Sequence, residues 1–285
     1  MRQRIYGRYL ILSFLLLVLA VLASAQQKKR LTFDQVYRGA ETGLSNPMPS
    51  ITGWEDDTHY LETRRKDGEP AKYYSVDAKS GKEKEVPSKT PDLSQFKDVV
   101  GSEVNVNFPA TANDARTRLI YAKDKDLYFL NTATKEFKRL TQTPSEEKNP
   151  TLSPDGNYVA FTRDNNLFAI DLGAGKEIQY TADGSKFIYN GYSSWVYMEE
   201  ILGRGTRYKA FWWSPDSRKL AFMRFDDSKV PVFPLYNSEG THGFLEETPY
   251  PKPGDPNPDV RVGILPVAGG TVIWADFNEK NDQYF

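Results

Sequence analysis

The stretch LSPDGNYVAF at residues 152–161 decides the fold, because it returns as WSPDSRKLAF at residues 213–222. Serine, proline and aspartate favour a tight turn, and the apolar and aromatic residues that follow favour a strand. A turn-and-strand unit that returns after about 60 residues is typical of a repeat architecture. The chain is therefore expected to be built from repeated groups of strands.

A second recurring element supports this prediction. The segments SVDAKSGKE at 75–83, NTATKE at 131–136 and DLGAGKE at 171–177 have similar turn chemistry, and each is predicted to close a hairpin. Repeats of about 40 to 60 residues that hold several strands and an internal turn are the mark of β-propeller blades. The predicted fold class is all-β, an incomplete β-propeller with a short helical insertion.

Hairpin signals give the expected number of blades. They predict about four blades and the beginning of another, at residues 60–86, 118–141, 157–181, 219–235 and 262–277. Propellers close with about four to eight blades, so the chain is expected to hold part of one. The predicted organisation is a segment at 26–45 that leads into a partial propeller at 46–285.

The amino terminus resembles an export signal. Arg2, Arg4 and Arg8 precede an apolar run at 10–23, and an Ala-Ser-Ala sequence ending at Ala25 fits a cleavage site. Cleavage after Ala25 is predicted, with an uncleaved anchor as the alternative. The chain has no cysteine and so no disulfide. We expect a periplasmic or secreted bacterial protein without stable membrane association beyond this signal.

Composition and motifs exclude several classes of function. The 37 Lys and Arg residues balance 38 Asp and Glu residues and are spread along the chain, which argues against a nucleic acid partner. No Gly-x-Ser-x-Gly or nucleotide-binding glycine pattern is present. His59 and His242 are the two histidines, and their spacing fits no metal site. We expect no catalytic residue, cofactor or metal in this chain.

An insertion interrupts the blade rhythm at residues 189–205 and contains WVYMEE, ending in Glu199 and Glu200. Two adjacent carboxylates repel each other, and a cation between them relieves the repulsion. A free peptide α-ammonium, whose pKa is about 7.7 to 8.0, is one such cation. The alternative is an acidic helix start that is simply solvated.

Convergence of the two carboxylates requires a short helix. Neighbours on a strand point to opposite faces, whereas neighbours on a helical turn are about 100° apart. Asn190, Ser193 and Ser194 are candidate N-caps for such a helix.

Four ordered motifs make the chain resemble the N-terminal region of dipeptidyl peptidase IV, a prolyl oligopeptidase-type serine peptidase family. They are residues 190–200, 212–216, 224–231 and 249–258. The resemblance implies an eight-bladed propeller that caps an α/β-hydrolase domain. It also implies that Glu199 and Glu200 bind the amino terminus of the substrate, so that Xaa-Pro or Xaa-Ala dipeptides are released.

The resemblance also implies further substrate contacts, the position of the catalytic triad and the oligomeric state. Arg118 and Tyr197 are the expected additional substrate contacts, and Arg116 is an alternative to Arg118 on the same strand face. The family's Ser, Asp and His triad is expected beyond this chain, which should be inactive alone, and the full-length protein is expected to be a homodimer. The alternatives are a non-catalytic periplasmic propeller that binds a protein or glycan, or a tripeptidyl or acylaminoacyl peptidase relative.

Overall fold

The computed structural model describes residues 30–40, 48–65, 69–88 and 92–277. The predicted signal peptide lies outside these residues. The chain divides into two compact units, Met1–Ser88 and Lys89–Phe285, and each is described by itself.

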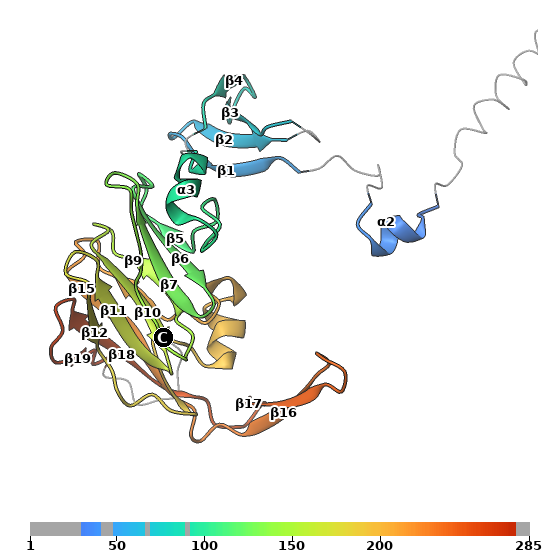
Figure 1. Ribbon diagram of the computed structural model, residues 1–285. Helices are drawn as coiled ribbons and strands as arrows, with labels where there is room; N and C mark the ends of the chain where they lie inside the picture. The colour runs from blue at the N-terminus through green and yellow to red at the C-terminus, as the bar shows by residue number, and fades with distance from the viewer. Residues whose placement is uncertain (1–29, 41–47, 66–68, 89–91, 278–285) are drawn as a thin grey trace, which may run out of the picture. The chain divides into compact units, whose positions relative to one another are not determined.

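The first unit holds a short helix and one four-stranded antiparallel sheet (Figure 1). Helix α2 (Phe33–Tyr37) begins at a capping box, in which the Gln35 amide donates to Thr32 Oγ1 and the Thr32 amide donates to Gln35 Oε1. The strands follow one another across the sheet in chain order: β1 (Ser50–Trp54), β2 (His59–Arg64), β3 (Lys72–Asp77) and β4 (Glu83–Val86).

The second unit begins with a 3₁₀ turn and a short helix, η1 (Ser94–Phe96) and α3 (Lys97–Val100), which pack on the first of its sheets. Two four-stranded antiparallel sheets follow, each again in chain order. Their strands are β5 (Thr111–Ala112), β6 (Arg118–Lys123), β7 (Asp126–Asn131) and β8 (Glu136–Arg139), then β9 (Lys148–Leu152), β10 (Tyr158–Arg163), β11 (Asn166–Asp171) and β12 (Lys176–Gln179).

The last sheet of the second unit is assembled from distant segments. Strand β15 (Lys219–Asp226) pairs with β13 (Ile188–Asn190) and β14 (Phe211–Trp213) on one side and with β18 (Asp259–Pro266) on the other. Strand β19 (Ile273–Trp274) pairs with β18. Strands β16 (Val232–Asn237) and β17 (Phe244–Pro249) form a separate two-stranded arm that extends away from this sheet (Figure 1).

The predicted hairpin turns are confirmed, and they share one hydrogen-bonding device. A side-chain oxygen at the end of the first strand accepts from backbone amides two and three residues later. Asp77 accepts from Lys79 and Ser80, Asn131 from Ala133 and Thr134, and Asp171 from Gly173 and Ala174. These bonds join residues at most three positions apart, so each turn is specified by its own local sequence.

The two Ser-Pro-Asp turns are also confirmed as copies of one structure. Ser153 Oγ donates to Asp155 over 2.5 Å and accepts from the Tyr158 amide over 3.0 Å. In the second copy Ser214 Oγ donates to Asp216 over 2.6 Å and accepts from the Lys219 amide over 3.0 Å. Each turn therefore delivers the chain into the next strand in the same way.

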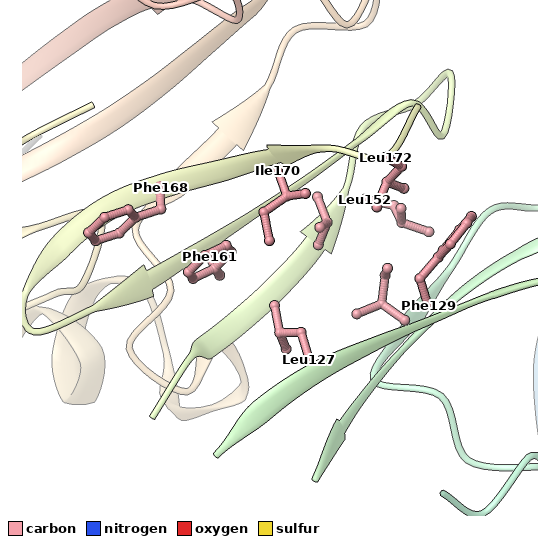
Figure 2. Packing of buried hydrophobic residues seen from close by; sticks show 9 residues of the cluster. Leu127, Phe129, Leu152, Phe161, Phe168, Ile170 and Leu172 are labelled. Atoms are coloured by element: carbon pink, nitrogen blue, oxygen red, sulfur yellow. The ribbon is translucent and has the colours of Figure 1, made fainter. Parts of the chain in front are cut away.

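Neighbouring sheets of the second unit bury apolar side chains against each other. Figure 2 shows Leu127 and Phe129 of β7 facing Leu152, Phe161 and other buried residues from β9 to β11. A second cluster joins the β9–β12 sheet to the last sheet through Leu167, Phe211 and Phe222. Each sheet thus needs its neighbour to exclude water, as expected for propeller blades.

The described residues contain four blade-like sheets, which confirms the predicted fold class and the prediction of about four blades. One of the predicted hairpins is wrong. Residues 219–235 do not form a hairpin, because β15 pairs along its whole length with β18. The hairpin predicted at 262–277 is confirmed by the antiparallel pairing of β18 with β19, but it completes the fourth sheet and does not begin another blade. Apolar alternation identified the strands but did not say which ones pair.

In the part of the chain that the structure describes, no helix has both the length and the apolar character needed to cross a membrane.

Candidate functional site

The insertion between β13 and β14 is closed at its base by backbone bonds. Tyr192 and Lys209 form an antiparallel bridge, the Ser193 amide donates to the Tyr208 carbonyl over 2.8 Å, and the Ala210 amide donates to the Gly191 carbonyl over 2.9 Å. Gly191 has a φ of 70°, and a Cβ there would lie 3.1 Å from the side chain of Leu167. The sheet therefore holds both ends of the insertion firmly.

The insertion contains the predicted short helix, which is a π-helix, η2 (Tyr197–Ile201). The Leu202 amide donates to the Tyr197 carbonyl over 2.7 Å, five residues back. One side of this turn is buried, since Tyr197 is 1% exposed and its ring packs edge-on against Phe225 at 4.9 Å. Glu200 is exposed on the same turn. The helix thus anchors one face in the core and presents Glu200 to solvent, with Glu199 partly buried beside it.

The predicted side-chain N-caps are wrong. Ser193 and Ser194 are 2% exposed, and their hydroxyls have no hydrogen-bond partner among the described residues. Asn190 donates its side-chain amide to Asp183 over 2.8 Å instead. The backbone carbonyl of Ser194, which accepts from the Met198 amide over 3.1 Å, starts the helix. Burial of the two serines in the base of the insertion keeps them away from the capping position.

One arginine lies against the acidic pair. Glu199 accepts hydrogen bonds from Arg204, with Arg204 Nε 2.7 Å and 2.6 Å from its two carboxylate oxygens, and the Arg204 terminal nitrogen also donates to it. The side chain of Glu199 is 15% exposed and that of Arg204 is 78% exposed. The bonds to Glu199, and then the negative charges of Glu199 and Glu200, raise the pKa of Arg204. Both carboxylates therefore act on one cation.

The second acid of the pair has no such partner. Within the described residues Glu200 forms no ion pair, although it lies next to Glu199 and within electrostatic range of Arg204. Two acids with one exposed guanidinium leave one negative charge uncompensated.

Aromatic rings pack within and around the insertion. Tyr192 and Tyr208 stack with ring centroids 4.8 Å apart and planes within 4° of parallel. Burial, followed by the charges of Glu246 and Glu199, raises the pKa of Tyr208. Trp195 packs against Tyr250 at 4.5 Å and so ties the insertion to the chain that follows the β16–β17 arm.

A cavity of about 520 Å³ begins beside the insertion. Tyr192, Gly205, Arg207 and Lys209 line it from the insertion, and the β9 region lines it as well. Lys148 lies 5.1 Å from the centre of the Tyr192 ring. Burial lowers the pKa of Lys209.

The other predicted site residues have their own partners in the blades and the core. Arg118 starts β6 and donates to the Gly156 carbonyl over 2.7 Å and to Asn157 over 2.8 Å, and no hydrogen bond of the described residues joins it to the insertion. Arg116 lies in the turn before β6 with a φ of 49°, so the expectation that it shares a strand face with Arg118 is wrong. Tyr197 is on the helix with the acids, but its ring is in the core.

Sequence reasoning missed Arg204 and Tyr208 as members of the site. Arg204 follows Glu199 by five residues, a spacing that pairs side chains only because Gly203 ends the helix and the chain turns back. No periodic pattern marks that spacing. No group of three or more His, Cys, Asp or Glu side chains suited to a metal ion occurs in the described ranges of the chain.

Comparison with known proteins shows the family to which the sequence is similar. Residues 105–285 match the family described as dipeptidyl peptidase IV N-terminal region. The chain is 43% identical over 140 residues to the "Probable dipeptidyl-aminopeptidase B" of Sordaria macrospora, a match that covers 45% of this chain and 15% of the relative. It is 32% identical over 171 residues to the protein of that name from Pyrenophora tritici-repentis, covering 52% and 19%.

A solved structure has the same fold. The crystal structure of Porphyromonas gingivalis dipeptidyl peptidase 4 superposes with a TM-score of 0.63 at 23% sequence identity, and the match covers 90% of this chain and 36% of that one. The chain thus spans about a third of that protein, and its matched stretches span less than a fifth of the two curated relatives.

Proposed function

The chain belongs to the dipeptidyl peptidase IV N-terminal region family, and we propose that it binds the free amino terminus of peptide substrates. Glu199 and Glu200 bind the α-ammonium. A catalytic domain of the full-length protein then releases Xaa-Pro or Xaa-Ala dipeptides, because the fixed amino terminus sets how much of the peptide reaches the scissile bond.

The observation that carries this proposal is that Glu199 and Glu200 lie on one helical turn and that Glu199 already binds a cation there. Glu199 accepts hydrogen bonds from the exposed Arg204 guanidinium, and Glu200 forms no ion pair among the described residues. A peptide ammonium has the same charge and donates three hydrogen bonds, so it suits the same pair of acids. The buried face of η2 keeps both acids on one small turn.

Isothermal titration of the chain with a matched pair of peptides tests the proposal. One peptide has a free amino terminus and begins Ala-Pro, and the other is identical but N-acetylated. We expect the free peptide to bind at least about tenfold more tightly at pH 6.5, because a charge-assisted hydrogen bond contributes about 1.5 to 3 kcal/mol. Above pH 8 the preference should disappear as the ammonium loses its proton.

Two variants complete this experiment. Glu200→Gln should lose most of the preference for the free amino terminus, since it removes the uncompensated charge with little change in shape. Glu136→Gln removes an exposed carboxylate from the β7–β8 hairpin and should bind like the parent chain. If the parent chain binds the acetylated and free peptides equally, it has no site for the peptide amino terminus. That result would favour a propeller that recognises a partner by other surfaces.

Export and assembly are further parts of this proposal. The Arg-rich start and the apolar run at 10–23 support cleavage after Ala25 and a periplasmic or secreted location, and Edman sequencing of the mature protein should then begin at Gln26.

We also propose that the full-length protein is a homodimer. The β16–β17 arm exposes Tyr236 at 68% and Leu245 at 65%, which is the kind of apolar surface that protein partners cover. Leu245→Glu should then shift the sedimentation coefficient of the full-length protein to that of a monomer. A parent protein that sediments as a monomer would contradict the dimer.

A further inference from the structure

The pairing of Arg204 with Glu199 bears on which peptides the site accepts. Arg204 belongs to the short turn η3 (Arg204–Thr206) that directly follows the helix, and its guanidinium reaches both oxygens of Glu199. Its side chain is 78% exposed, so the side chain is open to solvent and to a bound peptide. The cation is therefore part of the surface that a substrate meets.

We propose that Arg204 is a specificity-determining residue that selects against peptides whose first side chain is cationic and favours those whose first side chain is acidic. The inference rests on the proposed function. With Arg204 in place, the three charged groups carry one net negative charge, which a single α-ammonium neutralises. A second cation on the same residue of the peptide then finds no free acid and meets the guanidinium.

In a peptide that begins with lysine, the α-ammonium and the side-chain ammonium belong to the same residue. When the α-ammonium is bound at the acidic pair, the side-chain ammonium must therefore lie close to it. A peptide held at Glu200 by its α-ammonium projects its first side chain within reach of the adjoining turn. A lysine or arginine there is repelled by Arg204, whereas an aspartate or glutamate can accept a bidentate hydrogen bond from it. Because the pair is exposed, solvent screens both effects, and each should change affinity by about twofold to fivefold.

Isothermal titration of the chain at low salt with three peptides tests the inference. The peptides differ only in the first residue, which is Glu, Met or Lys, and each continues with Pro and a common tail. The parent chain should bind them in the order Glu, Met, Lys, from tightest to weakest. Arg204→Gln should remove this order, with the Lys peptide gaining and the Glu peptide losing affinity. Arg204→Lys, which keeps the charge, should retain it.

The matched control is Arg38→Gln. Arg38 is 71% exposed and pairs with Asp34 at 3.1 Å, so this variant removes the same charge from a similar exposed pair in the first unit. It should leave the order unchanged. The same order in Arg204→Gln as in the parent chain would overturn the inference, as would an equal effect of Arg38→Gln.

The N-acetylated Met peptide separates this failure from failure of the amino-terminal site. If the parent chain still prefers the free peptide but Arg204→Gln does not alter the order, Arg204 alone is misassigned. If the parent chain binds free and acetylated peptides equally, both proposals fail. Circular dichroism of each variant checks that the exposed substitutions leave the fold intact.

Discussion

The rings of Tyr192 and Tyr208 stack in parallel, 4.8 Å apart, at the base of the insertion that carries the acidic pair. Tyr192 precedes the helix and Tyr208 follows it. Their stacked rings therefore join the two ends of the insertion next to the backbone bridge between Tyr192 and Lys209. Aromatic pairs contribute about 0.5 to 1.5 kcal/mol beyond the burial of their area. The position of Glu199 and Glu200 thus depends on a contact made outside the helix.

Replacement of Tyr208 by alanine should therefore loosen the insertion without unfolding the blades. We expect amide hydrogen exchange over residues 194–206 to quicken by about tenfold, because the lost stacking corresponds to about 1.4 kcal/mol of local stability. Tyr208→Phe keeps the stacked ring and should exchange like the parent chain. Unchanged exchange in the alanine variant would show that the backbone bridge alone holds the insertion.

Gly203 controls how the chain leaves the helix. It has a φ of 83°, and an added Cβ would meet no atom within 4 Å. Alanine there would be strained by its backbone alone, at a cost of about 1 to 3 kcal/mol. We expect Gly203→Ala to lower the free energy of unfolding in urea by that amount. Gly205, two residues later, also has open space around an added Cβ, but its φ is not positive. Gly205→Ala should therefore lower the free energy of unfolding by less than about 1 kcal/mol.

Asp227 should give the chain a distinctive pH dependence. Burial, and secondarily the charge of Asp226, raises the pKa of its carboxyl to about 7. Between pH 4 and 7 the folded chain keeps this proton while the unfolded chain releases it. Stability therefore falls as pH rises through this range, by up to about 1.4 kcal/mol per pH unit, and levels off above pH 7.

Comparison with Asp227→Asn isolates this contribution. The difference in melting temperature between the variant and the parent chain should grow from pH 4 to pH 7 in favour of the variant. Asp226 provides the contrast, because its bonds to Ser228 lower the pKa of its carboxyl, so its contribution is lost as pH falls through the acid range. A difference that does not vary with pH would contradict a neutral Asp227 in the folded chain.

Phe161 fills the space between two sheets of the second unit. It is fully buried and stacks on Phe168 with ring centroids 5.7 Å apart (Figure 2). Phe161→Ala should lower the free energy of unfolding by about 3 to 5 kcal/mol, because the cavity cannot collapse between two rigid sheets. Phe244→Ala, in the exposed arm, should cost less than about 1 kcal/mol. Equal costs in urea denaturation would contradict the assignment of Phe161 to a shared core.

The sequence by itself determined the turns, the strands and the adjacency of Glu199 and Glu200. Asp77, Asn131 and Asp171 fold their hairpin turns through bonds to amides within three residues, so the information is local and can be read from order and residue type. The need for a short helix at the acids also follows from local geometry, and η2 supplies it.

Only the tertiary structure decided which strands pair and which cation meets the acids. Strand β15 pairs with β18, beyond the arm, over its whole length, and alternation of residue types does not identify that partner because it says which side chains share a face and not which backbone lies alongside. Arg204 reaches Glu199 because the chain reverses direction at Gly203, directly after the helix. The opposite face of that helix packs on Phe225 through the ring of Tyr197. Such contacts depend on surfaces that exist only once distant segments have packed together.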